Sequence, residues 1–216
     1  MAIELTNDGL LIIISGPSGS GKGTITKNLR NKEGYALSIS MTTREQRKGE
    51  VNGEDYIFCN EDEFIKTRDS GGFLEHATFC GNYYGTPISY VRGKMEQMQT
   101  VVLEIDVVGA LQVKEKFPTA PLIFLMPPTL EELRKRLISR GREDLDEIRR
   151  RLNHALKEID MMDKYDYLII NEDIETACKE IGLIVAAERL RPIRSKGRIE
   201  GFFGDLEGEE HVKAII

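Results

Sequence analysis

A glycine-rich loop that ends in a lysine follows the first apolar run of the chain. The run is Leu10–Ile14, and the loop reads SGPSGSGKGT over residues 15–24. Residues 16–22 fit the pattern G-x-x-x-x-G-K, placed between a strand-like run and a segment that can form a helix. Main-chain N–H groups of such a loop point inward and, with the N-terminus of the helix, form an anion site. The chain is therefore expected to contain a sheet whose first strand ends at this loop; the alternative is a plain glycine-rich turn with a chance lysine.

The loop predicts a site for a nucleoside triphosphate. Lys22 supplies a mobile positive charge for the β- and γ-phosphates. The next position is often a Ser or Thr whose hydroxyl binds Mg²⁺, but here it is Gly23, followed by Thr24. We therefore expect Mg²⁺ to be held mainly by phosphate oxygens and water, because this ion loses its water reluctantly. The residues expected to bind the nucleotide here are Gly16, Pro17, Ser18, Gly19, Ser20, Gly21, Lys22, Gly23 and Thr24.

Apolar runs and helical patterns alternate along much of the chain. Strand-like runs cover residues 10–14, 36–40, 101–105, 121–126 and 167–170. Helical patterns cover residues 22–32, 107–117, 129–140 and 174–190. This alternation predicts an α/β fold with a five-stranded parallel sheet flanked by helices. Ligands of such sheets bind at the carboxyl ends of the strands.

Two stretches interrupt this alternation. Residues 41–88 contain short strand-like segments separated by turn signals, and they predict a small mixed α+β insertion. Residues about 138–150 look helical and basic, and residues 134–151 hold eight Lys or Arg against four Asp or Glu. A run of this kind is either a solvated helix face or a basic flap over an anion. The phosphate loop favours the flap.

Charge and hydropathy exclude several partner classes. The net charge of −6 disfavours a general nucleic-acid binder. No apolar stretch approaches the roughly 20 residues of a membrane helix, so no membrane partner is expected. The amino-terminal residues lack the pattern of a secretory signal. Three scattered cysteines, Cys59, Cys80 and Cys178, indicate free thiols in a reducing compartment, and we expect a cytoplasmic protein.

The insertion at residues 41–88 carries a second candidate anion site. Arg44 and Arg47 lie three residues apart, and guanidinium groups bind phosphate in a bidentate way. Tyr56 and Tyr84 offer hydroxyls that complete such a site, and Glu75 lies between them in the sequence. Each residue alone could be structural. Their combination in one insertion, together with a phosphate loop, predicts a second substrate pocket.

These motifs, taken in order, resemble the guanylate kinase family. The matching segments are GPSGSGKGT, the pattern S-x-S-x-T-T-R-x-x-R at residues 38–47, GEVNGEDY at 49–56, FLE at 73–75, GNYYGT at 81–86, LEID at 103–106, the arginine-rich segment and IINED at 169–173. The resemblance covers about residues 10–190. It implies a nucleoside monophosphate kinase with a phosphate-loop core, a GMP-binding insertion and a helical lid.

The resemblance implies a role for each matched residue. Ser40 and Thr86 contact guanine or nearby groups, and Glu75 accepts the N–H donors of guanine. The GMP phosphate is bound by Arg44, Arg47, Tyr56 and Tyr84. Asp106 lies near the reacting groups and the metal, and Asn171 lies near the adenine. The arginines of the lid that close over ATP, and that are expected to act in catalysis with Lys22, Arg44 and Asp106, are Arg136, Arg140 and Arg151.

The expected reaction is phosphoryl transfer from ATP to GMP, with dGMP as a second acceptor. Two alternatives stay open: a non-catalytic guanylate-kinase-like domain that binds phosphorylated partners, and a kinase for a related sugar phosphate. No oligomeric state is predicted. The expected domains are a core (residues 1–40, 89–132 and 155–190), a GMP-binding domain (41–88), a lid (133–154) and a carboxyl-terminal tail (191–216).

Overall fold

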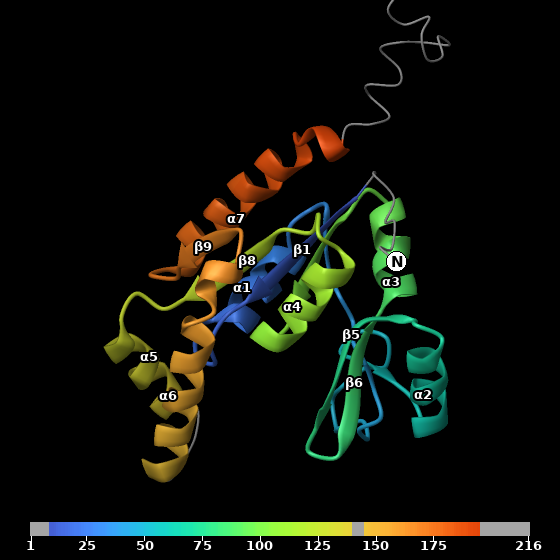
Figure 1. Ribbon diagram of the computed structural model, residues 1–216, viewed down its shortest axis with the longest axis horizontal. Helices are drawn as coiled ribbons and strands as arrows, with labels where there is room; N and C mark the ends of the chain where they lie inside the picture. The colour runs from blue at the N-terminus through green and yellow to red at the C-terminus, as the bar shows by residue number, and fades with distance from the viewer. Residues whose placement is uncertain (1–8, 140–144, 195–216) are drawn as a thin grey trace, which may run out of the picture.

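The computed structural model of the chain, which describes residues 9–139 and 145–194, is built on a central parallel sheet (Figure 1). The five strands follow the order β2-β7-β1-β8-β9, and all their pairings are parallel. Their bounds are β1 Leu10–Ser15, β2 Tyr35–Leu37, β7 Thr100–Glu104, β8 Leu122–Met126 and β9 Tyr167–Ile170. The predicted five-stranded parallel sheet of an α/β fold is confirmed.

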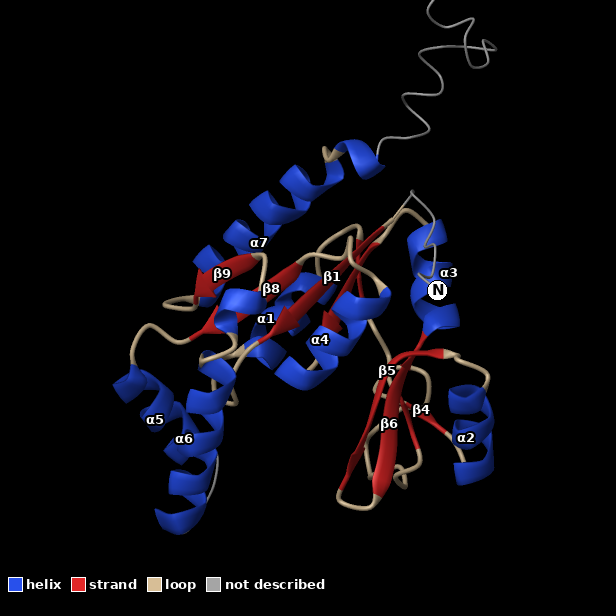
Figure 2. Cartoon of the chain, viewed as in Figure 1, coloured by secondary structure: helices blue, strands red, loops and turns tan. Residues whose placement is uncertain are grey.

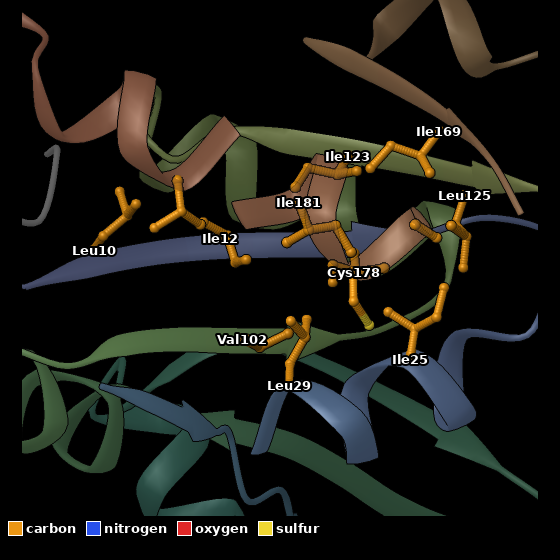
Figure 3. Close-up of a cluster of buried hydrophobic side chains, with 13 residues drawn as sticks. Leu10, Ile12, Ile25, Leu29, Val102, Ile123, Leu125, Ile169, Cys178 and Ile181 are labelled. Atoms are coloured by element: carbon orange, nitrogen blue, oxygen red, sulfur yellow. The ribbon is translucent and has the colours of Figure 1, made fainter. Parts of the chain in front are cut away.

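Helices cover both faces of this sheet (Figure 2). The covering helices are α1 (Lys22–Arg30) and α7 (Ile174–Arg189) on one face, and α3 (Ile88–Glu96) and α4 (Val107–Lys116) on the other. Alternate residues of a strand point to opposite faces, so Leu10 and Ile12 pack with Ile25 and Ile181 (Figure 3), whereas Leu11 packs toward α3 and α4. Strand β1 is therefore buried on both sides, and its carboxyl end is held firmly where the phosphate loop begins.

A second, smaller sheet has the strand order β4-β3-β6-β5. Its strands are β3 Met41–Thr42, β4 Ile57–Phe58, β5 Phe73–Phe79 and β6 Asn82–Pro87. Helix α2, Glu61–Asp69, lies between β4 and β5 in the chain. The buried Phe64 of α2 stacks on Phe73 and Tyr83, with ring centroids 4.6 and 5.3 Å apart. Helix α2 thus covers one face of the β5–β6 hairpin. The register shifts between Phe73 and His76, so the other face carries Glu75, Ala77 and Tyr84.

Two helices, α5 (Leu130–Ser139) and α6 (Leu145–Ile159), pack against each other through Leu133, Leu137 and Ala155. In Figure 1 this pair projects from the core on the same side as the β5–β6 hairpin. The expected lid residue Arg140 lies outside the described residues, as do residues 195–216 of the tail. Within residues 9–139 and 145–194, no helix combines the length and apolar character that a membrane span requires.

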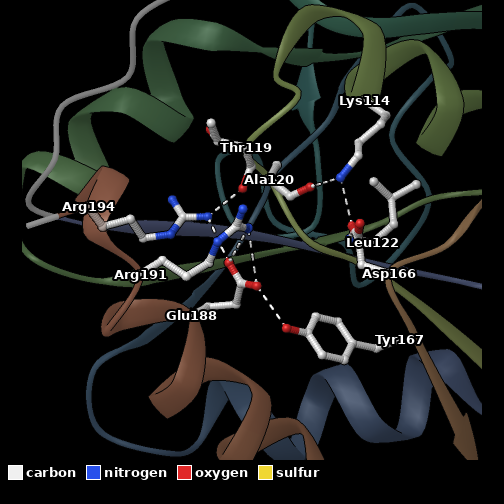
Figure 4. Close-up of polar contacts among 9 residues, drawn as sticks. All are labelled: Lys114, Thr119, Ala120, Leu122, Asp166, Tyr167, Glu188, Arg191 and Arg194. Atoms are coloured by element: carbon white, nitrogen blue, oxygen red, sulfur yellow. Dashed lines mark hydrogen bonds and ion pairs between the residues drawn. The ribbon is translucent and has the colours of Figure 1, made fainter.

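A buried carboxylate fastens the end of α7 to the sheet (Figure 4). Glu188 accepts hydrogen bonds from Tyr167 Oη (2.8 Å), Arg191 Nη1 (3.1 Å) and Arg194 Nη2 (3.1 Å). Arg194 also donates to the main-chain oxygen of Thr119. Tyr167 opens β9 and Thr119 precedes β8, so this cluster joins the amino ends of two strands to the 3₁₀ turn η2 (Pro192–Arg194) that follows α7. A second 3₁₀ turn, η1 (Met162–Lys164), precedes β9.

Candidate active site

The phosphate loop, residues 16–21, needs glycine where other parts of the chain approach it closely. Gly16 has φ +140°, and a Cβ there would lie 2.1 Å from the main-chain oxygen of Leu125. Gly21 has φ +95°, and a Cβ there would lie 2.4 Å from Nδ2 of Asn171. A Cβ at Gly16 would clash with rigid main chain, and one at Gly21 would displace the Asn171 amide and need a left-handed backbone that other residues rarely adopt. The loop is therefore pressed against the carboxyl end of β8 and against the segment after β9.

Lys22 is held inside this loop. Its Nζ donates to the main-chain oxygens of Gly16 and Pro17, the second at 3.0 Å. The cavity beside it measures about 340 Å³. Its lining residues are Gly16, Ser18, Gly19, Gly21, Lys22, Gly23, Glu104, Ile105, Asp106 and Glu158. A lysine, a loop rich in main-chain N–H groups and carboxylates of the neighbouring strand end thus face one space, a combination that suits phosphates with a divalent cation.

The residues around Gly23 fit an ion bound largely through phosphates and water. A Cβ at Gly23 would lie 3.7 Å from Glu104 Oε1, an ordinary contact, so the glycine is not sterically required. Glu104 Oε2 accepts a hydrogen bond of 2.6 Å from Thr26, whereas Thr24 lines a different cavity. Among the described residues no group of three or more metal-binding side chains gathers. Glu104 and Asp106, at the end of β7, and Glu158 of α6 are the carboxylates that line this cavity, and carboxylate oxygen suits Mg²⁺.

A second cavity of about 450 Å³ adjoins the other side of the loop. It is lined by Gly19, Gly21, Thr24, Arg136, Asn171, Glu172, Asp173 and Ile174. Asn171 Nδ2 donates to the main-chain oxygen of Ser20 at 2.7 Å, and Arg136 donates to the main-chain oxygen of Asn171 at 3.2 Å. Arg136 is oriented further by Glu132, one turn earlier on α5. The structure therefore brings Asn171 and Arg136 together beside the phosphate loop.

Helix α6 reaches the phosphate loop through Arg151. Its Nη2 donates to Ser18 Oγ at 3.2 Å. Glu158 follows seven residues later, two helical turns, and so shares the face of α6 that points to the loop. Its carboxylate is buried, lines the cavity beside Lys22 and lies 3.3 Å from Nδ1 of His154. Two of the three expected lid arginines, Arg136 and Arg151, thus contact the loop.

A third cavity, of about 260 Å³, lies on the open face of the β5–β6 hairpin. Its lining residues are Ser40, Glu75, Ala77, Phe79, Tyr84, Ile105 and Asp106. Glu75 is buried, and its Oε1 accepts a hydrogen bond of 2.7 Å from Thr86 Oγ1. Asp106 and Ile105 also line the cavity beside Lys22. The two cavities therefore share lining residues at the carboxyl end of β7.

Burial raises the pKa of Glu75 above its ordinary value. The hydrogen bond from Thr86 lowers this pKa, and the negative charge of Asp106 raises it again. Asp106 caps α4, because its Oδ1 accepts a hydrogen bond of 2.7 Å from the N–H of Gly109. Two acidic groups thus face one pocket, so the pocket favours a ligand edge that donates hydrogen bonds.

The expected phosphate-binding side chains lie together only in part. The guanidinium of Arg44 lies over the ring of Tyr56, 5.2 Å from its centroid. The rings of Tyr56 and Tyr84 meet edge to face at 6.1 Å. Arg47 is exposed and lies on the same loop as Arg44. The structure therefore brings Arg44, Tyr56 and Tyr84 into one cluster and leaves the side chain of Arg47 at the surface.

Sequence reasoning missed several residues that line these cavities. Glu104 and Ile105 follow the buried run of β7, and their place at a strand end was a usable signal. Ala77 and Phe79 alternate with Glu75 along β5, so the strand period places all three on one face. The contact of Glu158 with this site depends on the packing of α6, for which the local sequence gives no signal.

The fold and the site together define a phosphate-loop nucleotide kinase: a loop for a triphosphate and an acceptor pocket share one acidic strand end. Residues 9–188 match the family model described as guanylate kinase. The crystal structure of guanylate kinase from Anaplasma phagocytophilum is similar, with a TM-score of 0.70 and 33% sequence identity over 95% of this chain and 100% of that chain. Shikimate kinase from Bacteroides thetaiotaomicron is more distant, with a TM-score of 0.43 and 14% identity over 82% of this chain and 98% of that chain. The chain belongs to the guanylate kinase family, which confirms the resemblance found in its motifs.

Proposed function

We propose that this protein transfers the γ-phosphoryl group of ATP to GMP, and to dGMP, giving ADP and the corresponding diphosphate. The observation that carries the proposal is the buried carboxylate of Glu75 in the cavity next to the phosphate loop. Guanine presents two adjacent donors, N1–H and N2–H, and a carboxylate accepts both. Thr86 uses one acceptor position of Glu75, and a carboxylate has about four. Adenine presents a lone pair at N1 and would leave Glu75 unpaired.

The chemistry needs positioning and positive charge. A phosphomonoester has a second pKa near about 6, so GMP is largely dianionic at neutral pH and its oxygen is already a nucleophile. No general base is then required, and the loose transition state needs stabilisation of spread negative charge. Lys22, Arg136 and Arg151 supply this charge from three elements around one loop. We assign the same role to Arg140.

Mg²⁺ is the metal expected with ATP, and the carboxylates of Glu104 and Asp106 would hold its water molecules. When bound, the ion neutralises charge on the transferring phosphates. Glu104 is oriented for this task by the hydrogen bond from Thr26. Asp106 is oriented by the N–H of Gly109.

The proposal extends to the division of the chain. We assign GMP binding to residues 41–88, with Arg44, Arg47, Tyr56 and Tyr84 around the phosphate and Ser40 and Thr86 near the base. We assign a lid to residues 133–154, and adenine binding to the cavity that Asn171 lines. We also propose a cytoplasmic location, because the three cysteines are free thiols in the described structure. No observation favours a non-catalytic or sugar-phosphate alternative.

A coupled assay of ADP release tests the reaction with GMP, dGMP, AMP and UMP as acceptors. We expect turnover with GMP and dGMP, and a kcat/KM for AMP lower by about 10⁴-fold, because buried acceptors left unpaired discriminate strongly. Equal rates with GMP and AMP, or no rate with GMP, would contradict the proposal.

A further inference from the structure

A single carboxylate organises the loop between β3 and β4, which carries both arginines of the acceptor site. Glu50 Oε1 accepts a hydrogen bond of 2.8 Å from Arg44 Nη2, and its Oε2 accepts one of 3.0 Å from Arg44 Nη1. The same Oε2 accepts the main-chain N–H of Arg47 at 2.8 Å. The N–H of Glu50 returns a bond of 3.1 Å to the main-chain oxygen of Arg47. Glu50 thus fixes the side chain of one arginine and the backbone of the other.

The contacts of Arg44 divide its guanidinium into two edges. Nη1 donates to Glu50 and to the main-chain oxygen of Glu45 (2.6 Å), and Nη2 gives one hydrogen to Glu50. A guanidinium has five N–H groups in a fixed plane, so these bonds use three of them. The Nε–H and the second N–H of Nη2 are parallel and form the other edge. Two parallel N–H groups are the pair that binds two oxygens of a phosphate.

Packing holds the plane of the same group. The Arg44 guanidinium carbon lies 5.2 Å from the ring centroid of Tyr56 and 5.6 Å from that of Phe58. Its side chain is only 13% exposed, and that of Glu50 is 21% exposed. The aromatic rings fix the plane and the carboxylate fixes rotation within the plane. Hydrogen bonding to Glu50 raises the pKa of Arg44, and the nearby Tyr84 hydroxyl adds to the rise.

We propose that Glu50 is a positioning residue for the acceptor phosphate: it holds one edge of Arg44 so that the second edge is presented to GMP. This inference rests on the proposed function and adds a residue to it. The proposed effect of Glu50 is geometric and not electrostatic, because a negative charge beside a phosphate site weakens the attraction between that site and a phosphate. Arg44, Arg47 and Glu50 together still carry one net positive charge, and the site gains a fixed bidentate donor. Preorganised donors cost less entropy when a ligand binds.

The variant Glu50→Gln tests the proposal with almost no change in shape. An amide keeps one acceptor oxygen but turns an N–H₂ group toward Arg44 or toward the N–H of Arg47. We expect the KM for GMP to rise about tenfold or more, because charge-assisted hydrogen bonds are lost. The KM for ATP and the thermal unfolding midpoint should stay close to those of the unchanged protein. An unchanged KM for GMP would overturn the proposal.

Glu45→Gln is the matched control. Glu45 is exposed on the same loop and contacts Arg44 through its main-chain oxygen, so this variant removes an equal charge and keeps that contact. We expect its KM for GMP to change less than about twofold, as for surface substitutions in general. If Glu45→Gln and Glu50→Gln raised the KM for GMP equally, loss of negative charge alone would explain the change. That result would overturn the proposed positioning role of Glu50.

A double-mutant cycle with Arg44→Lys separates positioning from a general structural role. Lysine keeps the charge but has no planar edge to orient. If Glu50 acts through Arg44, Glu50→Gln should have almost no further effect on the KM for GMP in the Arg44→Lys background. Full additivity would overturn the proposal. If the unchanged protein fails to phosphorylate GMP, the proposed function fails; if it phosphorylates GMP and the cycle is additive, only the role of Glu50 fails.

Discussion

At the scale of single residues, Glu75 combines a negative charge with deep burial, and this combination has a cost. The folded protein holds the Glu75 proton more tightly than the unfolded chain does, because burial raises the pKa. The stability associated with the protonated form is present below the ordinary glutamate pKa and is lost as pH rises through the raised pKa. Ionising Glu75 in this pocket therefore costs stability, a cost that sites built for function often carry.

Replacing Glu75 by Gln should separate stability from activity. We expect the free energy of unfolding at pH 7 to be equal to or higher than that of the unchanged protein, because the buried charge is gone. The advantage should shrink as pH falls from the raised pKa of Glu75 toward the ordinary glutamate pKa, and it should be absent below that value. The kcat/KM for GMP should fall by about 100-fold or more, since a charged acceptor is lost. Urea unfolding across pH and steady-state kinetics measure both; a variant that is less stable and keeps GMP turnover would contradict this account.

Gly23 offers a test of how the metal is held. A side chain fits there, 3.7 Å from Glu104 Oε1, so Gly23→Ser should fold normally. Its hydroxyl adds a ligand, and we expect the Mg²⁺ concentration for half-maximal activity to fall about tenfold. Gly23→Ala has a similar volume and no hydroxyl, so it should leave the Mg²⁺ requirement unchanged. Measuring activity against Mg²⁺ concentration tests this prediction. If the half-maximal Mg²⁺ concentration shifted equally in both variants, the volume of the side chain and not its hydroxyl would be responsible.

The predictability of the site differs from residue to residue. Lys22 and the loop glycines follow from a local pattern, because the strand, the loop and the helix are contiguous. Glu75 and Asp106 required the family resemblance. The bonds of Glu50 with Arg44 and of Glu104 with Thr26 could not be predicted, since each partner is chosen by tertiary packing and the same glutamates would be ordinary surface residues elsewhere.

At the scale of elements, helix α2 shows how a short segment is stabilised at its start. Asn60 Oδ1 accepts the N–H of Glu63 at 2.8 Å, and the Glu63 carboxylate accepts the N–H of Asn60 at 3.1 Å, a reciprocal capping box. We expect Asn60→Ala to lower the free energy of unfolding by about 1 kcal/mol. Asn60→Asp keeps the acceptor and should cost little. Chemical denaturation monitored by circular dichroism measures the stability of both variants. Equal losses of unfolding free energy in Asn60→Ala and Asn60→Asp would contradict a capping role.

Element prediction succeeded where burial leaves a clear sequence period. The five strands of the large sheet are apolar runs, and the sequence located each of them within a few residues. Helix α3 was not predicted, because Gly93 and β-branched residues weaken its helical signal, and it is stabilised by burial of Val91 and Met95 against the sheet. Strands β3 and β4 have two residues each and exist only through pairing with their neighbours.

At the scale of the whole molecule, the Glu188 cluster fastens α7 to the sheet far along the strands from the phosphate loop. Burial raises the pKa of Glu188, but hydrogen bonds from Tyr167, Arg194 and Arg191 together lower it below its ordinary value. The stabilisation is therefore present above the ordinary glutamate pKa and is lost as pH falls through the lowered pKa. The cluster is a device for stability, located at the amino ends of strands whose carboxyl ends carry the site.

Removing this carboxylate should cost much more stability than removing a surface one. We expect Glu188→Ala to lower the free energy of unfolding at pH 7 by about 3 kcal/mol, since the partly buried Tyr167 and Arg194 lose their charged acceptor. Glu180, exposed on the same helix, provides the control. Glu180→Ala should change the free energy of unfolding by less than about 0.5 kcal/mol. Urea unfolding at pH 7 and in acid gives both values. A difference that grows in acid would contradict the assigned direction.

The position of β1 in the middle of the sheet also sets the order in which the chain acquires its parts during synthesis. Strand β1 hydrogen-bonds to β7 and β8, and the end of β8 leaves the ribosome about 110 residues after the end of β1, roughly 5–20 s later. The β5–β6 hairpin pairs neighbouring segments and can form as soon as both have emerged. The phosphate loop is thus among the first segments translated and among the last completed. A nascent chain that stalls before β8 is made therefore carries the β5–β6 hairpin while β1, the strand that leads into the phosphate loop, still lacks one of its two neighbours.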